Sequence, residues 1–213
     1  MSIFEKEPSD FIKKFGIVAI VLGVLFFVTS AAQAADPAAW TSVTATGVLS
    51  NGMTLTVEEE LRYSGVDLAS KTSRHTDASV STAVEGFNFT VGHRNTNNDA
   101  DRTYAGISKS LGAIAGWDAD ASTTLEFFDN DTVRNRTKFS AQKADAVAGV
   151  VPYLSTEFFI TDKGDVTSNR STVGAAKAVN ESTAIDIWYQ VDTDVAGDSA
   201  STDAVGVGLN ISF

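Results

Sequence analysis

The sequence predicts an all-β protein whose strands separate an apolar surface from a polar one. Two observations support this. The closing segment AVGVGLNISF alternates between apolar and small or polar side chains up to Phe213, which is the two-residue period of a strand. The 213 residues are also rich in Thr, Ser, Ala and Val and contain only 3 Pro. Such a composition favours strands, and no helical period appears after residue 36.

A secretory signal peptide is predicted for residues 1–34. Two lysines precede the apolar run IVAIVLGVLFFV, and the small residues AQA, ending at Ala34, follow it. This is the layout of a signal peptide with its cleavage site. We expect cleavage after Ala34, which leaves residues 35–213 as the mature domain. The alternative is an uncleaved membrane anchor, because the uncharged run 15–35 is long enough to span a bilayer of about 30 Å and acidic residues precede it.

The mature chain consists of segments in which apolar residues alternate with polar ones. MTLTVEEELRY (53–63) alternates apolar residues with Thr, Glu and Arg, apart from Glu59, and STAIDIWYQV repeats the pattern. Single-chain bacterial barrels have an even number of strands. We therefore expect ten strands, in which 40–49 and its neighbour do not both span. Twelve is the alternative, with a further weak strand in 64–74 or 112–118. The eleven candidates cover 40–49, 53–63, 75–84, 87–94, 102–111, 121–128, 132–142, 149–160, 170–178, 182–191 and 204–213.

Short and long connections broadly alternate between these strands. Short turns are expected at 50–52, 85–86 and 179–181, and longer polar loops at 64–74, 95–101, 161–169 and 192–202. Two connections interrupt this alternation. A short one stands at 129–131, where a long loop is due, and a long one at 112–120, where a short turn is due. Strands of about ten residues joined in this way are typical of outer-membrane barrels. We predict an antiparallel up-and-down transmembrane β-barrel in the bacterial outer membrane, with the periplasm as the alternative location.

Charged residues stand opposite the apolar set. In a barrel they would face the lumen and pair across strands, whereas on a soluble sandwich they would form a solvated face. Aromatic residues at strand ends favour the membrane, where they form interfacial girdles; these are Trp40, Tyr63, Phe87, Tyr189 and Phe213. We expect a lumen charge network made of Glu58, Glu60, Arg62, Glu126, Arg134, Arg136, Lys138, Glu157 and Asp186.

The closing GLNISF resembles the last strand of bacterial outer-membrane barrels. More narrowly, the chain resembles a family of small outer-membrane proteins catalogued only as a domain of unknown function. This resemblance rests on five segments, namely EEELRY, VRNRTKFS, VPYLSTEFFI, NRSTVGAAKAVN and the closing strand. It implies that Phe213 is an assembly signal read by the barrel-assembly machinery, and that outer-membrane lipid is a partner. It implies no activity.

Composition and motifs exclude several classes of function. A net charge of −11 argues against a nucleic-acid partner. The absence of cysteine excludes thiol chemistry and Cys-based metal sites. HExxH, Walker and GxGxxG motifs are missing as well. We therefore expect no cofactor and no enzymatic activity.

Three weaker chemical interpretations of the sequence have simpler alternatives. The pairs Glu58/Glu60 and Asp129/Asp131 could supply a general acid and base, but lumen and turn roles are favoured. The loops DTDVAGD and TDKGD could hold a divalent cation weakly, although neither matches an EF-hand. Neither His75 nor His93 shows the His-x-Ser pattern of a lipid A deacylase.

Three classes of function remain. We expect a structural or interaction barrel with a lumen largely filled by side chains, because about eight strands leave an interior that side chains fill. A narrow passive pore for small solutes is the alternative. A lipid-modifying barrel enzyme is the least favoured.

Overall fold

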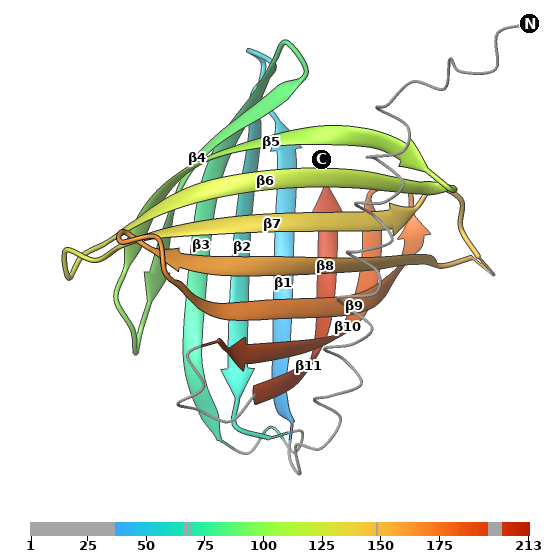
Figure 1. The fold of residues 1–213 in the computed structure, drawn as a ribbon. Coiled ribbons are helices and arrows are strands. Elements are labelled where there is room, and N and C mark those ends of the chain that lie inside the picture. The colour runs from blue at the N-terminus through green and yellow to red at the C-terminus, as the bar shows by residue number, and fades with distance from the viewer. Residues whose placement is uncertain (1–36, 66–67, 69, 148, 196–201) are drawn as a thin grey trace, which may run out of the picture.

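The described residues form one closed β-barrel in a computed structural model of the protein (Figure 1). They comprise 37–65, 68, 70–147, 149–195 and 202–213. Within these ranges no helix is long and apolar enough to cross a membrane. The strands are β1 (Ala38–Val48), β2 (Thr54–Tyr63), β3 (Lys71–Val84), β4 (Phe87–Thr96), β5 (Arg102–Ile114), β6 (Trp117–Phe128), β7 (Val133–Lys143), β8 (Val151–Thr161), β9 (Val166–Asn180), β10 (Thr183–Asp194) and β11 (Thr202–Ser212).

The barrel has eleven strands, so the prediction of ten, or of twelve, was wrong. All eleven alternating segments form strands of 10 to 15 residues, and each pairs with a neighbour on both sides. An even count was expected because it is usual in bacterial barrels, but closure itself only requires that the first strand meet the last. The all-β class and the closed barrel are confirmed.

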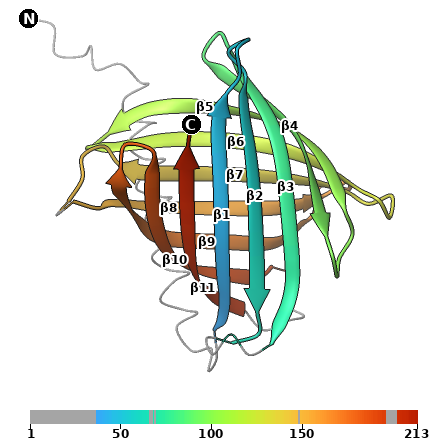
Figure 2. The same cartoon turned by 180° about the vertical axis from the view of Figure 1, so that it is seen from behind.

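The odd count makes the closing pair parallel (Figure 2). Consecutive strands are antiparallel throughout, whereas β1 pairs with β11 in the same direction, from Ala38↔Ala204 to Thr46↔Ser212. The barrel is therefore up-and-down but not wholly antiparallel. Beyond Ser212, the backbone N–H of Phe213 donates to the carbonyl of Thr46 at 3.0 Å.

The two ends of the barrel differ in their connections. We call the end with 49–53, 85–86, 115–116, 144–150 and 181–182 the turn end, and the end with 64–70, 97–101, 129–132, 162–165 and 195–201 the loop end. The turns at Glu85-Gly86 and Ala115-Gly116 have positive φ at both residues, as tight hairpins require. The long connection expected over 112–120 is thus a two-residue turn.

Strand alternation sorts side chains between lumen and exterior. Large apolar residues are exposed on the outer face, with Val91 60% and Ile187 58% exposed. The alternate positions of the same strands face the lumen. Residues 1–34, for which a signal peptide was predicted, and the alternative anchor over 15–35 lie outside the described residues.

Candidate functional site in the barrel lumen

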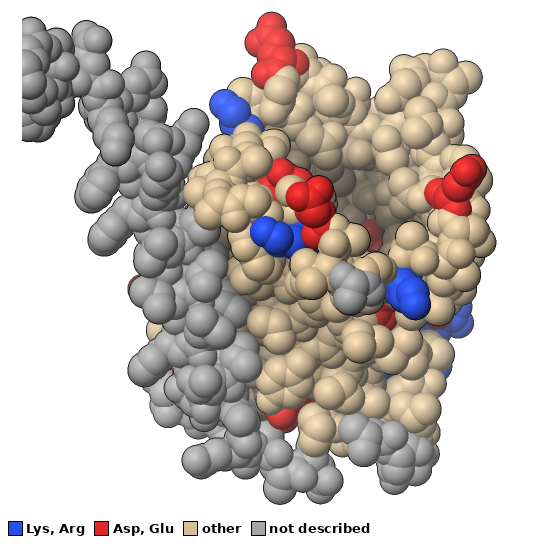
Figure 3. Space-filling view, turned by 90° about the vertical axis from the view of Figure 1, so that its right-hand side faces the viewer, with Lys and Arg blue, Asp and Glu red and all other residues tan. Residues whose placement is uncertain are grey.

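The lumen contains two neighbouring cavities lined by charged side chains. The larger is about 410 Å³ and the smaller about 150 Å³, and both are lined by Arg62, Arg94, Arg136 and Arg170. Seen from the side on which the β5–β6 turn lies, the surface is hollowed (Figure 3). Of the predicted network, the larger cavity is lined by Glu58, Glu60, Arg62, Arg136, Lys138, Glu157 and Asp186. Arg134 lines the smaller one.

Glu126, the remaining predicted residue, is fully buried between three guanidinium groups. Its carboxylate lies 2.6 Å from Arg134 Nη2, 3.2 Å from Arg102 Nε and 3.6 Å from Arg136 Nε. The three arginines come from β5 and β7, which flank β6. A single carboxylate therefore forms ion pairs with three guanidinium groups.

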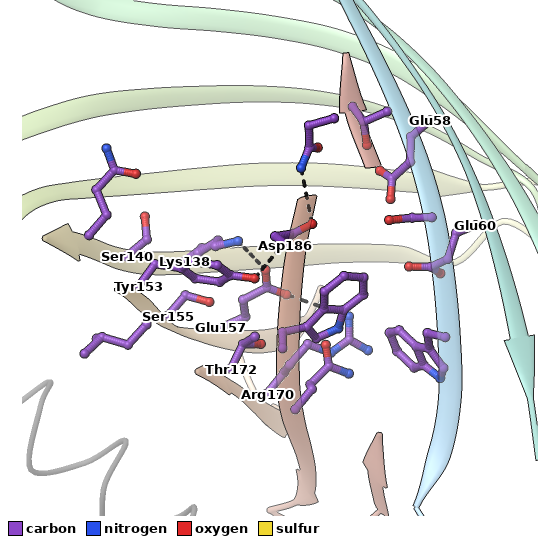
Figure 4. A pocket seen from close by; sticks show the side chains of 18 of the residues that line it. Glu58, Glu60, Lys138, Ser140, Tyr153, Ser155, Glu157, Arg170, Thr172 and Asp186 are labelled. Carbon is purple, nitrogen blue, oxygen red and sulfur yellow. Dashed lines mark hydrogen bonds and ion pairs between the residues drawn. The ribbon is translucent and has the colours of Figure 1, made fainter. Parts of the chain in front are cut away.

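A second group of ion pairs surrounds Glu157 on β8 (Figure 4). Lys138 Nζ is 3.3 Å from one carboxylate oxygen, and Arg170 Nη1 is 3.9 Å from the other. Arg170 also donates two hydrogen bonds to Asp192, at 2.8 and 2.9 Å. These contacts link four consecutive strands, β7 to β10, across the lumen wall.

Two tyrosines cross a glycine on the neighbouring strand to reach an aspartate one strand further on. Tyr153 on β8 pairs with Gly174 on β9, and its hydroxyl donates to Asp186 on β10 at 3.0 Å. Tyr104 on β5 crosses Gly92 in the same way and donates to Asp77 at 2.5 Å. A Cβ on either glycine would collide with the tyrosine ring. The glycines therefore make room for these bonds.

Trp40 lies inside the lumen, which corrects the prediction that it belongs to an interfacial girdle. Its side chain lines the larger cavity and the residue is 9% exposed. The guanidinium carbon of Arg62 lies 3.8 Å from the centre of its ring, a cation–π contact. Position at a strand end suggested a girdle, but the alternation of β1 directs this residue inward.

The predicted network omitted several lumen residues. Asp77, Arg94, Arg102, Arg170 and Asp192 all take part in ion pairs. Asp77, Arg94, Arg102 and Arg170 lie within predicted strands but were not assigned to the network, and Asp192 was assigned to a loop. The alternation of those four strands, and an extension by one residue of the strand that ends at 191, place all five on the polar face, so the signal was present in the sequence.

The candidate catalytic groups are arranged differently from a hydrolytic site. His75 lies 2.9 Å from Ser73 Oγ, but its other ring nitrogen faces Thr96 Oγ1 at 3.1 Å rather than a carboxylate. His93 lies 3.1 Å from Thr103 Oγ1. Asp129 and Asp131 belong to the 129–132 connection. Among the described residues, no three His, Asp or Glu side chains gather as a metal site would require.

No protein-family model matches the chain, and no curated protein matches it either.

Proposed function

We propose that the protein is an outer-membrane β-barrel whose lumen forms a narrow, charge-lined passage for small polar solutes. The observation that carries the proposal is the closed barrel with its charged lumen and its apolar exterior. Closure leaves no unpaired strand edge, which a bilayer requires of a spanning sheet.

Polar groups on the outer face are compatible with this location because they bond to one another. Asn135 donates to Thr123, and Thr137 donates to Asn135, both at 2.9 Å. Arg74 pairs with Glu59 near the loop end. At the turn end, Lys109 lies 4.5 Å from the ring centre of Phe87, an arrangement suited to a membrane interface.

The cavities favour a passage over a fully packed interior. Eight strands leave a lumen that side chains fill, and three further strands enlarge it. The two cavities abut at four arginines, which would form the constriction of the passage. The structural role remains the second candidate, because ion pairs tie neighbouring strands together around the lumen.

Conductance of the refolded protein in planar bilayers tests the proposal. We expect small, stable steps, well below those of a 16-stranded porin in the same bilayer. Arg136→Ala should enlarge the steps, because this side chain lines both cavities. Arg74→Ala, on the outer face, is the matched control and should leave them unchanged. A correctly folded barrel with no conductance above bare lipid would contradict the passage and favour the structural role.

A further inference from the structure

The smaller cavity has a strongly cationic wall. Among the described residues, it is lined by two acidic residues, Asp99 and Asp192, and by six arginines, Arg62, Arg94, Arg102, Arg134, Arg136 and Arg170. Of the acidic residues that line the larger cavity, Glu58, Asp120 and Asp186 lie nearer the turn end, whereas Glu60 and Glu157 lie nearer the loop end. The arginines of the smaller cavity all lie in the loop-end half of their strands.

Within the described part of the chain, three of these arginines share one carboxylate, whereas the other three each have their own. Arg62, Arg94 and Arg170 pair with Glu60, Asp77 and Asp192, respectively, at 2.8–2.9 Å. Arg102, Arg134 and Arg136 instead share Glu126. Arg102 Nε is buried and makes no aligned hydrogen bond in the described structure. Arg102, Arg134 and Arg136 (the trio) and the shared carboxylate thus have a net charge of +2. The three guanidinium groups also have more hydrogen-bond donors than one carboxylate can accept.

We propose that the chamber bounded by Arg102, Arg134 and Arg136 binds a tetrahedral oxyanion, either free phosphate or sulfate or the phosphate group of a small solute. Guanidinium groups bind such anions through paired, charge-assisted hydrogen bonds. A cavity of 150 Å³ corresponds to about five waters at ~30 Å³ each, which suits one oxyanion with a few waters. The inference goes beyond the proposed function and requires only the closed lumen.

Calorimetric titration of the refolded protein in detergent with inorganic phosphate, at constant ionic strength set by chloride, tests the site. We expect saturable binding to the wild type. Arg134→Gln and Arg102→Gln should each weaken it by roughly tenfold or more, the effect of losing one charge-assisted contact. Arg74→Gln is the matched control, because Arg74 faces outward, and it should bind phosphate as the wild type does.

Glu126→Gln gives a test in the opposite direction. Neutralising the shared carboxylate increases the positive charge of the trio, so phosphate should bind more tightly and should raise the thermal midpoint more than in the wild type. Competition by a phosphate monoester would assign the ligand as a group on a larger solute, and lack of competition would assign the free ion.

Wild-type protein that binds phosphate no better than chloride would overturn the inference, as would equal losses in Arg134→Gln and Arg74→Gln. Because binding in micelles does not depend on conduction, this failure is distinct from a failure of the proposed passage.

Discussion

Single glycines determine where the large lumen side chains lie. Gly206 on β11 pairs directly with Trp188 on β10, and the indole lies over the bare backbone of Gly206 and reaches Gly208. All three atoms nearest to a Cβ built at Gly206 belong to Trp188. The indole position therefore depends on the absence of one methyl group.

We expect Gly206→Ala to lower the free energy of unfolding by about 1–3 kcal/mol, the usual range for overpacking. The indole must leave its place, because the new Cβ would overlap it. Urea unfolding in micelles, followed by circular dichroism, measures the change. In a Trp188→Ala background the same substitution should cost much less, since the collision is gone. An equal cost in both backgrounds would contradict the assignment.

Lumen residues can be predicted from the sequence only where the ends of the strands are predicted correctly. Asp118 and Asp120 on β6 were assigned to a loop, because polar residues near a turn resemble loop residues in composition. Within a barrel, such residues occupy the inward positions of a strand. By contrast, Glu58, Glu60 and Arg62 belong to a segment that alternates clearly apart from Glu59, and they could be identified directly. The sharing of Glu126 could not be predicted, because it depends on the register of β5 and β7 against β6.

At the scale of elements, an exposed aromatic residue follows β11. Phe213 is 81% exposed, and its ring lies against Gly47 on β1 across the parallel pair. The ring is thus little buried but helps to define the closing seam. It should contribute less to stability than a core phenylalanine, whose removal costs about 3–5 kcal/mol.

We expect Phe213→Asp to lower the amount of protein in the outer membrane while leaving refolding from urea into micelles intact. The terminal ring would be read during assembly, whereas the barrel can close without it. Immunoblots of membrane fractions provide the measurement. Val48→Asp, another exposed apolar residue at the turn end, is the control and should retain normal levels. Normal levels of Phe213→Asp would count against an assembly signal.

At the scale of the whole molecule, eleven strands follow from the sequence once every alternating segment is accepted as a strand. The expectation of ten came from a general preference for even numbers and not from any residue of this chain. No segment between residue 40 and the C-terminus reads as too weak to span, and 40–49, the segment considered for omission, pairs on both sides as β1.

The odd number of strands predicts that the first and last residues of the barrel lie on opposite sides of a membrane. Ala38 and Ser212 lie at opposite ends of the barrel. Because the chain has no cysteine, single-cysteine variants can be labelled with a membrane-impermeant maleimide. In an outer membrane, Ala38→Cys should label like Asn130→Cys at the loop end, and Ser212→Cys like Asn51→Cys at the turn end. Only one pair should react in intact cells. Equal reactivity of both pairs would contradict a spanning barrel.

In the proposed membrane location, the parallel pairing of β1 with β11 would give the polypeptide a direction through the membrane. A barrel with an even number of strands returns its chain to the compartment from which it started, so both flanks face the same solution. Here the first and last residues of the barrel lie at opposite ends, so in a membrane they would face different compartments, as the flanks of a single-pass helix do. A domain joined before β1 and another joined after β11 would therefore be held on opposite sides of the membrane, linked by one rigid wall.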